Sequence, residues 1–286
     1  MPLNIYQEKP KHPLAGIKTV LAVAAGKGGV GKSVVTVNLA LALHSCGYRV
    51  GILDSDLYGP SIRKMLPEQE PPKQQGEQLI PARSHGIHVM SMAYFRKEDE
   101  AAIVRAPVAN RIIGQFIHNV EWGELDYLLI DFPPGTGDIQ LTLAQQAHLS
   151  GVILVTTPQE IALLDVRKAY SMFEHVHIPT VGVVENMSYY LHPPTEEKLY
   201  LFGKGGGDKL ASECKVPLLE SIPISPLLSL SADRGTSLFE MGSKEGELER
   251  RLFLSLAQNV EAQMQMMRSE NGAFLQNFEL IWKNHR

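Results

Sequence analysis

Residues 26 to 33 read Gly26-Lys27-Gly28-Gly29-Val30-Gly31-Lys32-Ser33, and this octet decides the fold class. It satisfies the phosphate-loop pattern G-x-x-x-x-G-K-[ST] in full. In such a loop the glycines allow consecutive backbone N–H groups to surround a polyphosphate. The lysine, here Lys32, contacts the β- and γ-phosphates, and the hydroxyl of Ser33 is a ligand of Mg²⁺. The octet therefore predicts binding of ATP together with Mg²⁺.

The sequence on either side of the octet supplies the context that the motif requires. Residues 19–25 (TVLAVAA) form an apolar, β-branched run long enough for a buried strand, and residues 34–44 (VVTVNLALALH) have a periodicity compatible with a helix. The loop is therefore expected at a helix N-terminus, where free N–H groups and the helix dipole favour phosphate. A chance glycine-rich turn is the alternative interpretation, and the flanking strand and helix count against it.

Apolar runs and helical patterns alternate along the rest of the chain. The predicted strands are 49–53, 87–92, 125–130, 152–156, 180–184 and 218–222, and the predicted helices are 108–119, 139–147, 161–173 and 207–213. Strands without polar alternation, separated by helices, are typical of a parallel sheet that is covered on both faces. We expect an α/β fold with a doubly wound, mostly parallel sheet of the P-loop NTPase type.

The length of 286 residues suits one large α/β domain. We expect an irregular arm over residues 1–18, an ATPase domain over 19–250 and a helical extension over 251–286. Residues 67–78 (PEQEPPKQQGEQ) are compositionally biased and predict a surface loop. Apolar residues of the extension recur at helical spacing, namely Leu252, Phe253, Leu256, Val260, Met264 and Met267. Its other face is rich in Gln and Glu, which favours packing on the domain or on a partner over a membrane.

Charge and composition exclude several classes of function. A net charge of −4 argues against a dedicated nucleic-acid surface. No stretch approaches the ~18 to 20 apolar residues of a membrane span, and residues 1–16 lack the apolar core of a signal peptide. We therefore expect a cytoplasmic location. Cys46 and Cys214 lack the paired spacing of a metal site, so packing is the expected role of both.

Acidic residues follow two of the predicted strands. Asp131 ends the run LDYLLI and opens DFPPGTGD, a position where a carboxylate leaves the sheet and meets Mg²⁺ through water. A helix-capping role is the alternative for Asp131. Asp54 and Asp56 follow the second strand, and their alternation puts both carboxylates on the same side of the chain. Turn formation alone also accounts for the Asp-Ser-Asp sequence.

Lys27, directly after the first glycine, resembles the deviant Walker A signature K-G-G-x-G-K-[ST]. That group of ATPases includes the MinD and ParA positioning proteins, the nitrogenase iron protein and the Mrp/ApbC iron–sulfur carriers. The resemblance implies a homodimer that closes face to face over ATP, with Lys27 reaching the partner's nucleotide. There it would stabilise charge on the transferred phosphoryl group. A solvated loop lysine is the alternative.

Four further segments are similar to the Mrp/ApbC branch in particular. They are DSDLYGPSI (54–62), WGELDYLLIDFPPGTGD (122–138), VTTPQEIALLDVRKAYSMF (155–173) and VGVVENMSYY (181–190), within a match over about residues 15 to 240. The resemblance implies a dimeric, Mg²⁺-dependent ATPase that assembles iron–sulfur clusters or transfers them to apoproteins. The alternative function is a MinD- or ParA-like positioning or scaffolding ATPase that acts through ATP-dependent dimerisation.

The same resemblance assigns roles to single residues. Lys27, Lys32 and Asp56 would be catalytic, with Asp56 orienting the attacking water or lying near Mg²⁺. Gly135 would lie near the γ-phosphate, and Asp138 would close the turn. At the base, Asn186 would read adenine through its amide, and Pro223 belongs to an apolar segment that would cover the ring.

One departure from the family concerns the [4Fe–4S] cluster that the resemblance also implies. Cluster-carrying members follow the NMSYY segment with Cys-Pro-x-Cys, and each subunit donates both thiolates. This chain has His192, Pro193 and Thr195 instead. A threonine does not replace a thiolate, and one histidine per subunit gives at most two imidazole ligands per dimer. We expect His192 to be a loop residue, with weak metal ligation across the dimer as the alternative.

Overall fold

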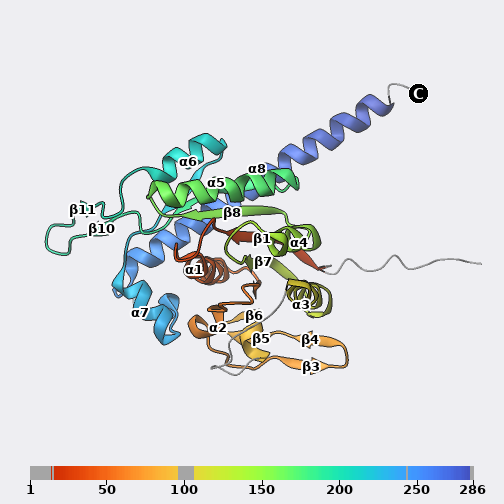
Figure 1. Ribbon diagram of the computed structural model, residues 1–286, viewed down its shortest axis with the longest axis horizontal. Coiled ribbons are helices and arrows are strands. Elements are labelled where there is room, and N and C mark those ends of the chain that lie inside the picture. The colour runs from red at the N-terminus through yellow and green to blue at the C-terminus, as the bar shows by residue number, and fades with distance from the viewer. Residues whose placement is uncertain (1–13, 15, 96–105, 243, 284–286) are drawn as a thin grey trace, which may run out of the picture.

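The computed structural model describes Leu14 and residues 16–95, 106–242 and 244–283 (Figure 1). Most of the predicted N-terminal arm, residues 1–13 and 15, lies outside these ranges. The first strand, β1 (Ile17–Ala24), leads into the glycine-rich octet, and α1 (Lys32–Ser45) follows it. The predicted order of strand, loop and helix around the octet is therefore confirmed.

The central sheet has eight strands in the order β12-β9-β8-β1-β7-β2-β6-β5. Their bounds are β2 Val50–Asp54, β5 Ala82–Ser84, β6 Ile87–Ser91, β7 Leu125–Asp131, β8 Gly151–Thr156, β9 Thr180–Glu185 and β12 Leu218–Ser221. Every pairing is parallel except that of the edge strand β5 with β6. The mostly parallel α/β fold is confirmed, and β1 lies inside the sheet between β7 and β8.

Helices cover both faces of this sheet (Figure 1). On one face lie α1, α2 (Ile62–Met65), α7 (Pro226–Arg234) and α8 (Glu247–Lys283); on the other lie α3 (Ala106–Asn119), α4 (Asp138–Gln146), α5 (Glu160–His175) and α6 (Gly206–Cys214). The sheet has a hydrophobic core on each face, and successive residues of β1 point into one core and then the other, because side chains alternate across a strand. Leu21 packs with α1, and Ala22 packs on the opposite face. This two-sided burial explains the unbroken apolar run in the sequence.

The predicted surface loop at 67–78 is wrong in one respect, because it contains strand β3 (Lys73–Gln75). This strand pairs antiparallel with β4 (Gln78–Ile80) across a turn at Gly76, where φ is 63°. All three residues of β3 are exposed and polar, so no apolar pattern marks the strand. Short elements elsewhere are the hairpin strands β10 (Tyr190–Leu191) and β11 (Lys198–Leu199) and the 3₁₀ helices η1 (Met92–Phe95) and η2 (Leu238–Glu240).

The long helix α8 contains most of the predicted extension. Phe253, Leu256, Val260 and Met264 of its predicted apolar face are buried in the same core as α1. This half of the helix therefore packs on the ATPase domain, whereas its end extends past the sheet (Figure 1). The boundary between domain and extension remains a prediction. None of the described helices is both long enough and apolar enough to cross a membrane.

Candidate nucleotide-binding site

The loop between β1 and α1 has a shape that only glycine permits. Gly29 and Gly31 have φ of 84° and 81°, in the left-handed region. A Cβ built on Gly31 would lie 2.1 Å from Nδ2 of Asn186, and one built on Gly26 would lie 2.0 Å from the carbonyl carbon of Asp165. The glycines thus bring the loop against β9 and α5 while it turns around the N-terminus of α1.

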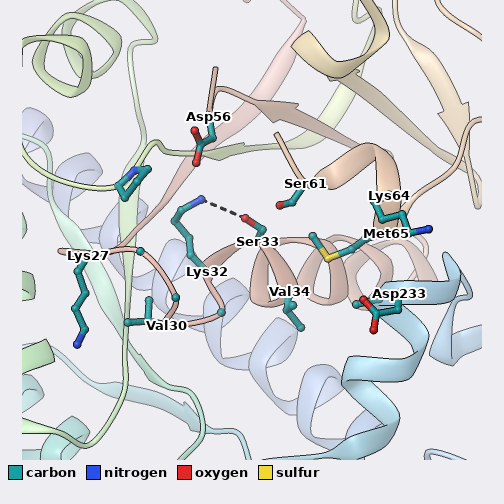
Figure 2. Close-up of a pocket in the computed structure, with 15 residues that line it drawn as sticks. Lys27, Val30, Lys32, Ser33, Val34, Asp56, Ser61, Lys64, Met65 and Asp233 are labelled. Carbon is teal, nitrogen blue, oxygen red and sulfur yellow. Dashed lines mark hydrogen bonds between the residues drawn. The ribbon is translucent and has the colours of Figure 1, made fainter. Parts of the chain in front are cut away.

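A cavity of about 360 Å³ opens above this loop (Figure 2). Its lining includes residues 27–34 from the loop and first turn of α1, with Asp56, Ser61, Lys64, Met65, Pro134, Ala232 and Asp233 from the surrounding segments. A cavity of this size, beside the free N–H groups of a helix N-terminus, suits a nucleotide polyphosphate.

Asp131, at the carboxyl end of β7, is the centre of the polar contacts below the loop. It is completely buried. Nζ of Lys32 lies 2.7 Å from its Oδ1, Oγ of Ser33 donates to its Oδ2 at 2.7 Å, and Oγ1 of Thr36 donates to its Oδ1 at 2.7 Å. Thr36 is not among the predicted site residues. The sequence offered a way to identify Thr36, because position 36 lies one helical turn beyond Lys32 and Ser33 and so on the same face of the predicted helix.

The donors at this point fit Mg²⁺. The hydroxyl of Ser33 and the carboxylate of Asp131 are hard oxygen donors held side by side, and Mg²⁺ binds proteins through one or two such groups while it keeps several waters. The predicted assignment of Ser33 as a direct ligand and Asp131 as a ligand through water is compatible with this geometry.

The two predicted acids at the carboxyl end of β2, Asp54 within the strand and Asp56 beyond it, have different surroundings. Asp54 is completely buried and accepts hydrogen bonds from Oγ of Ser91 at 2.9 Å and from the backbone N–H of Ile62 at 3.3 Å. Its burial, followed by the nearby charge of Asp131, raises the pKa of Asp54. Asp56 is half-buried and lines the cavity. The structure thus separates a buried acid that holds the segment after β2 from an acid that faces the cavity.

Lys27 and Lys32 differ in direction although both line the cavity. Lys32 points towards Ser33 and Asp56, whereas the side chain of Lys27 points away from them (Figure 2). Within residues 16–95, 106–242 and 244–283, Lys27 has no ion-pair or hydrogen-bond partner, and its side chain is half-buried. Its ammonium group is therefore available outside its own loop.

Asn186, predicted to read adenine, lies directly after β9 and contacts the loop. Its Nδ2 donates to the carbonyl oxygen of Val30 at 2.8 Å. The backbone N–H of Ser188 donates to Ile222, which brings Asn186 and Pro223 into neighbouring segments. Neither residue lines the cavity of Figure 2, and their contacts with a base remain predictions.

The segment after Asp131 has the predicted turn. Gly135 adopts φ of 97°, which favours glycine, and Asp138 is the first residue of α4. Pro134 of this segment lines the cavity. The position of Gly135 near a γ-phosphate remains a prediction.

The hairpin that carries His192 offers few donors for a metal. Nδ1 of His192 lies 3.1 Å from Oγ1 of Thr195, within the turn between β10 and β11.

The two cysteines lie elsewhere in the fold. Cys46 is exposed at the end of α1, and Cys214 is buried at the end of α6, where burial raises the pKa of its thiol to about 11. No group of three or more His, Cys, Asp or Glu side chains that suits a metal ion occurs in the described parts of the chain. The residues of the β10–β11 hairpin do not fit an iron–sulfur cluster, which is held by thiolates.

Comparisons with solved structures find proteins of similar fold. A nucleotide-binding protein from Archaeoglobus fulgidus, solved in complex with ADP, is 39% identical with a TM-score of 0.71, over 82% of this chain and 94% of that one. The cell-division ATPase MinD from Pyrococcus furiosus has a TM-score of 0.62 at 20% identity, over 86% of this chain and 99% of that one. At that identity the likeness to MinD shows the fold alone.

Comparisons of sequence identify the family. The family model described as NUBPL iron-transfer P-loop NTPase matches residues 16–261. A protein named iron–sulfur cluster carrier protein in Haemophilus influenzae is 44% identical over 251 residues, which are 87% of this chain and 67% of that protein. One of the same name in Pseudomonas fragi is 47% identical over 78% of each chain. The chain therefore belongs to the iron–sulfur cluster carrier family of P-loop NTPases.

Proposed function

We propose that the chain binds Mg·ATP in the cavity above residues 26–33 and hydrolyses it slowly as a homodimer. The convergence of Lys32, Ser33 and Thr36 on the buried carboxylate of Asp131 carries this proposal. The arrangement holds a flexible cation and two hydroxyls at the N-terminus of α1, where phosphate is favoured. The ADP complex of the relative from Archaeoglobus fulgidus supports the choice of ligand.

Each residue of the site has a distinct task in this proposal. Lys32 exchanges its ion pair with Asp131 for the β- and γ-phosphates, while Ser33 and, through water, Asp131 hold Mg²⁺. When bound, Mg²⁺ neutralises charge on the phosphate oxygens. Asp56 orients the attacking water from the cavity wall, and Lys27 acts on the nucleotide of the partner subunit.

The cellular role that we propose is nucleotide-dependent work with iron–sulfur assembly or recipient proteins. The 44% identity to a named carrier, against 20% to MinD, favours this role over a positioning function. Because His192 and Thr195 stand where thiolates are needed, we propose that the cluster ligands are not supplied by this hairpin.

Titration of a fluorescent ATP analogue with Mg²⁺ tests the nucleotide site. We expect Lys32→Ala to abolish binding, because it removes the cation that contacts the β- and γ-phosphates. Lys209→Ala, in which an exposed lysine of α6 is lost, is the matched control and is expected to bind normally. Circular dichroism establishes that both variants are folded. Normal affinity in folded Lys32→Ala would disprove the site assignment.

A further inference from the structure

A second cavity, of about 250 Å³, lies at the other end of the sheet from the nucleotide site. It is bordered by Trp122, which precedes β7, by His88 near the start of β6 and by Arg83 of β5. Trp122 and His88 lie at the amino ends of parallel strands and Arg83 lies on the antiparallel edge strand, whereas the octet follows the carboxyl end of β1 and Asp131 ends β7. The β3–β4 hairpin lies beside this edge of the sheet (Figure 1).

A row of paired residues crosses the sheet at the cavity, and two of them, His88 and Arg83, line it. Gly51 of β2 pairs with His88, and His88 pairs with Arg83, so the three positions share one face of the sheet. A Cβ on Gly51 would lie 3.0 Å from Cζ3 of Trp122. The absence of a side chain at Gly51 therefore leaves room for the indole of Trp122 on this face of the sheet.

Two polar atoms at this cavity are buried without a partner. Nε1 of Trp122 and Nδ1 of His88 have no hydrogen bond, and they are two of only six such buried side-chain atoms in the described residues. Trp122 itself is 3% exposed. A buried donor without an acceptor is costly, and an accepting atom of a ligand in the cavity would remove that cost. Burial, followed by the charge of Arg83, lowers the pKa of His88, and a neutral imidazole can still donate one hydrogen bond.

The charges around the cavity favour an anion. Arg83 and Lys73 border it, and neither side chain has an ion-pair or hydrogen-bond partner within the described ranges. Of the two carboxylates at the rim, Glu121 already accepts a hydrogen bond from Nε2 of Gln78 at 3.2 Å, and Glu70 is exposed, as are Arg83 and Lys73. The residues that line the cavity therefore include a guanidinium, an indole and an imidazole.

The remaining wall is apolar. Pro71, Ile80 at the end of β4, and Pro81 also line the cavity. Rigid proline rings and an aliphatic side chain suit a compact, planar or apolar group rather than a polar chain. The volume of about 250 Å³ limits that group to the size of a small molecule.

We propose that this cavity is a binding site for a small organic anion, a carboxylate on a compact apolar body. The carboxylate accepts hydrogen bonds from Arg83, Trp122 and His88, and the apolar body packs against Pro71, Ile80 and Pro81. The site is independent of the nucleotide cavity, because the two share no lining residue.

Benzoate is a suitable probe, and the indole N–H of Trp122 is a direct readout. The chain has two tryptophans, so Trp282→Phe in the full chain leaves the Trp122 indole as the only one in a ¹⁵N-labelled spectrum. We expect benzoate to shift this resonance along a saturating curve at millimolar concentrations. Benzyl alcohol and benzylammonium have the same ring without the negative charge and are expected to bind about tenfold more weakly or worse.

Substitution at the guanidinium tests the same site from the protein side. Arg83→Gln should weaken benzoate binding about tenfold, because it removes the charge-assisted hydrogen bonds. Arg167→Gln, on α5, is the matched control and should bind benzoate as before. Equal shifts by all three probes, unchanged affinity in Arg83→Gln, or no saturable shift with millimolar benzoate would each overturn the proposal. Normal binding of the ATP analogue in Arg83→Gln shows that the variant is folded.

Discussion

At the scale of single residues, Asp131 organises the nucleotide site. Its carboxylate is buried, forms an ion pair with Lys32 and accepts hydrogen bonds from Ser33 and Thr36. These three contacts stabilise the negative charge in the absence of water. Removing one of these partners leaves a buried carboxylate short of a donor. The ion pair with Lys32 also keeps the lysine beside the loop until a phosphate competes for it.

Thr36 offers a measure of this compensation. We expect Thr36→Val, which preserves the shape of the side chain, to lower the free energy of unfolding by about 1–3 kcal/mol, because Oδ1 of Asp131 loses a buried hydrogen bond. Urea unfolding without nucleotide measures the change. Thr142→Val, at a half-buried position of α4, is the control. Equal effects of the two substitutions would contradict the role given to Thr36.

The two cysteines should react differently with N-ethylmaleimide. Burial raises the pKa of Cys214 from 9.0 to about 11, so at pH 8 only about 0.1% of this thiol is the reactive thiolate. Between those two pKa values the folded state binds more protons than the unfolded state, so the stability contributed by Cys214 falls as the pH rises. We expect mass spectrometry to find one label, on the exposed Cys46, in native protein and two after denaturation. Native labelling of Cys214 at a similar rate would contradict its burial.

The contacts of several of these residues were not predictable from their neighbours in the sequence. Thr36 bonds to Asp131 across 95 positions, a contact that only the pairing of β1 with β7 creates. Asp54 and Asp56 have the same chemistry and nearly the same position, yet the sheet buries the first and leaves the second at the cavity. The local sequence predicts two acids at the carboxyl end of β2. Which of them is buried depends on the packing of β6 and β7 beside β2, which the local sequence does not reveal.

At the scale of elements, long apolar segments were predictable and short exposed ones were not. Strand β7 is buried along almost its whole length, and helix α5 buries one face with residues at helical spacing, so their hydrophobic patterns predicted them closely. Strands β3 and β11 have two or three exposed residues each, and hairpin pairing rather than burial defines them. The same reason explains why the segment around His192 was expected only as a loop.

The β10–β11 hairpin permits a test of the prediction on cluster binding. We expect the unmodified chain, reconstituted anaerobically with iron and sulfide, to show no stable absorbance near ~400 nm, because the hairpin has no thiolate. His192→Cys with Thr195→Cys should confer that absorbance, since the two side chains already lie 3.1 Å apart at their polar atoms.

A second pair of introduced cysteines controls for adventitious iron. Ser171→Cys with His175→Cys places two exposed thiols one turn apart on α5 and should give no stable cluster. A stoichiometric cluster in the unmodified chain would refute the prediction, and its loss in His192→Ala would then identify His192 as a ligand.

At the scale of the whole molecule, the surface around the octet suits a second subunit. Ile161 and Leu164 of α5 are 64% and 53% exposed, and the backbone of Asp165, the next residue along α5, lies against Gly26 of the loop. Exposed apolar side chains beside a functional loop often belong to an interaction surface. Together with the direction of Lys27, this surface supports the proposed dimer over ATP.

The proposed dimer predicts a specific defect in Lys27→Ala. Each subunit should keep its affinity for ATP, because Lys32 and the loop N–H groups remain. Hydrolysis should fall roughly 10²-fold or more, as expected when a cation that stabilises the transition state is lost. Phosphate release and titration of the ATP analogue separate the two quantities. Equal loss of binding and hydrolysis would show that Lys27 contacts the nucleotide of its own subunit in the ground state.

Mixed dimers decide between action within a subunit and action across the interface. Lys27→Ala and Asp56→Asn subunits, carrying different affinity tags, are co-expressed and the heterodimer is purified. If Lys27 acts on the partner's nucleotide, one site of this heterodimer combines an intact Asp56 with an intact Lys27, and hydrolysis returns at that site. If Lys27 acts within its own subunit, both sites lack a catalytic group, and the heterodimer is as inactive as either homodimer. We expect recovery, because Lys27 points away from its own Lys32 and Asp56 and has no partner among the described residues.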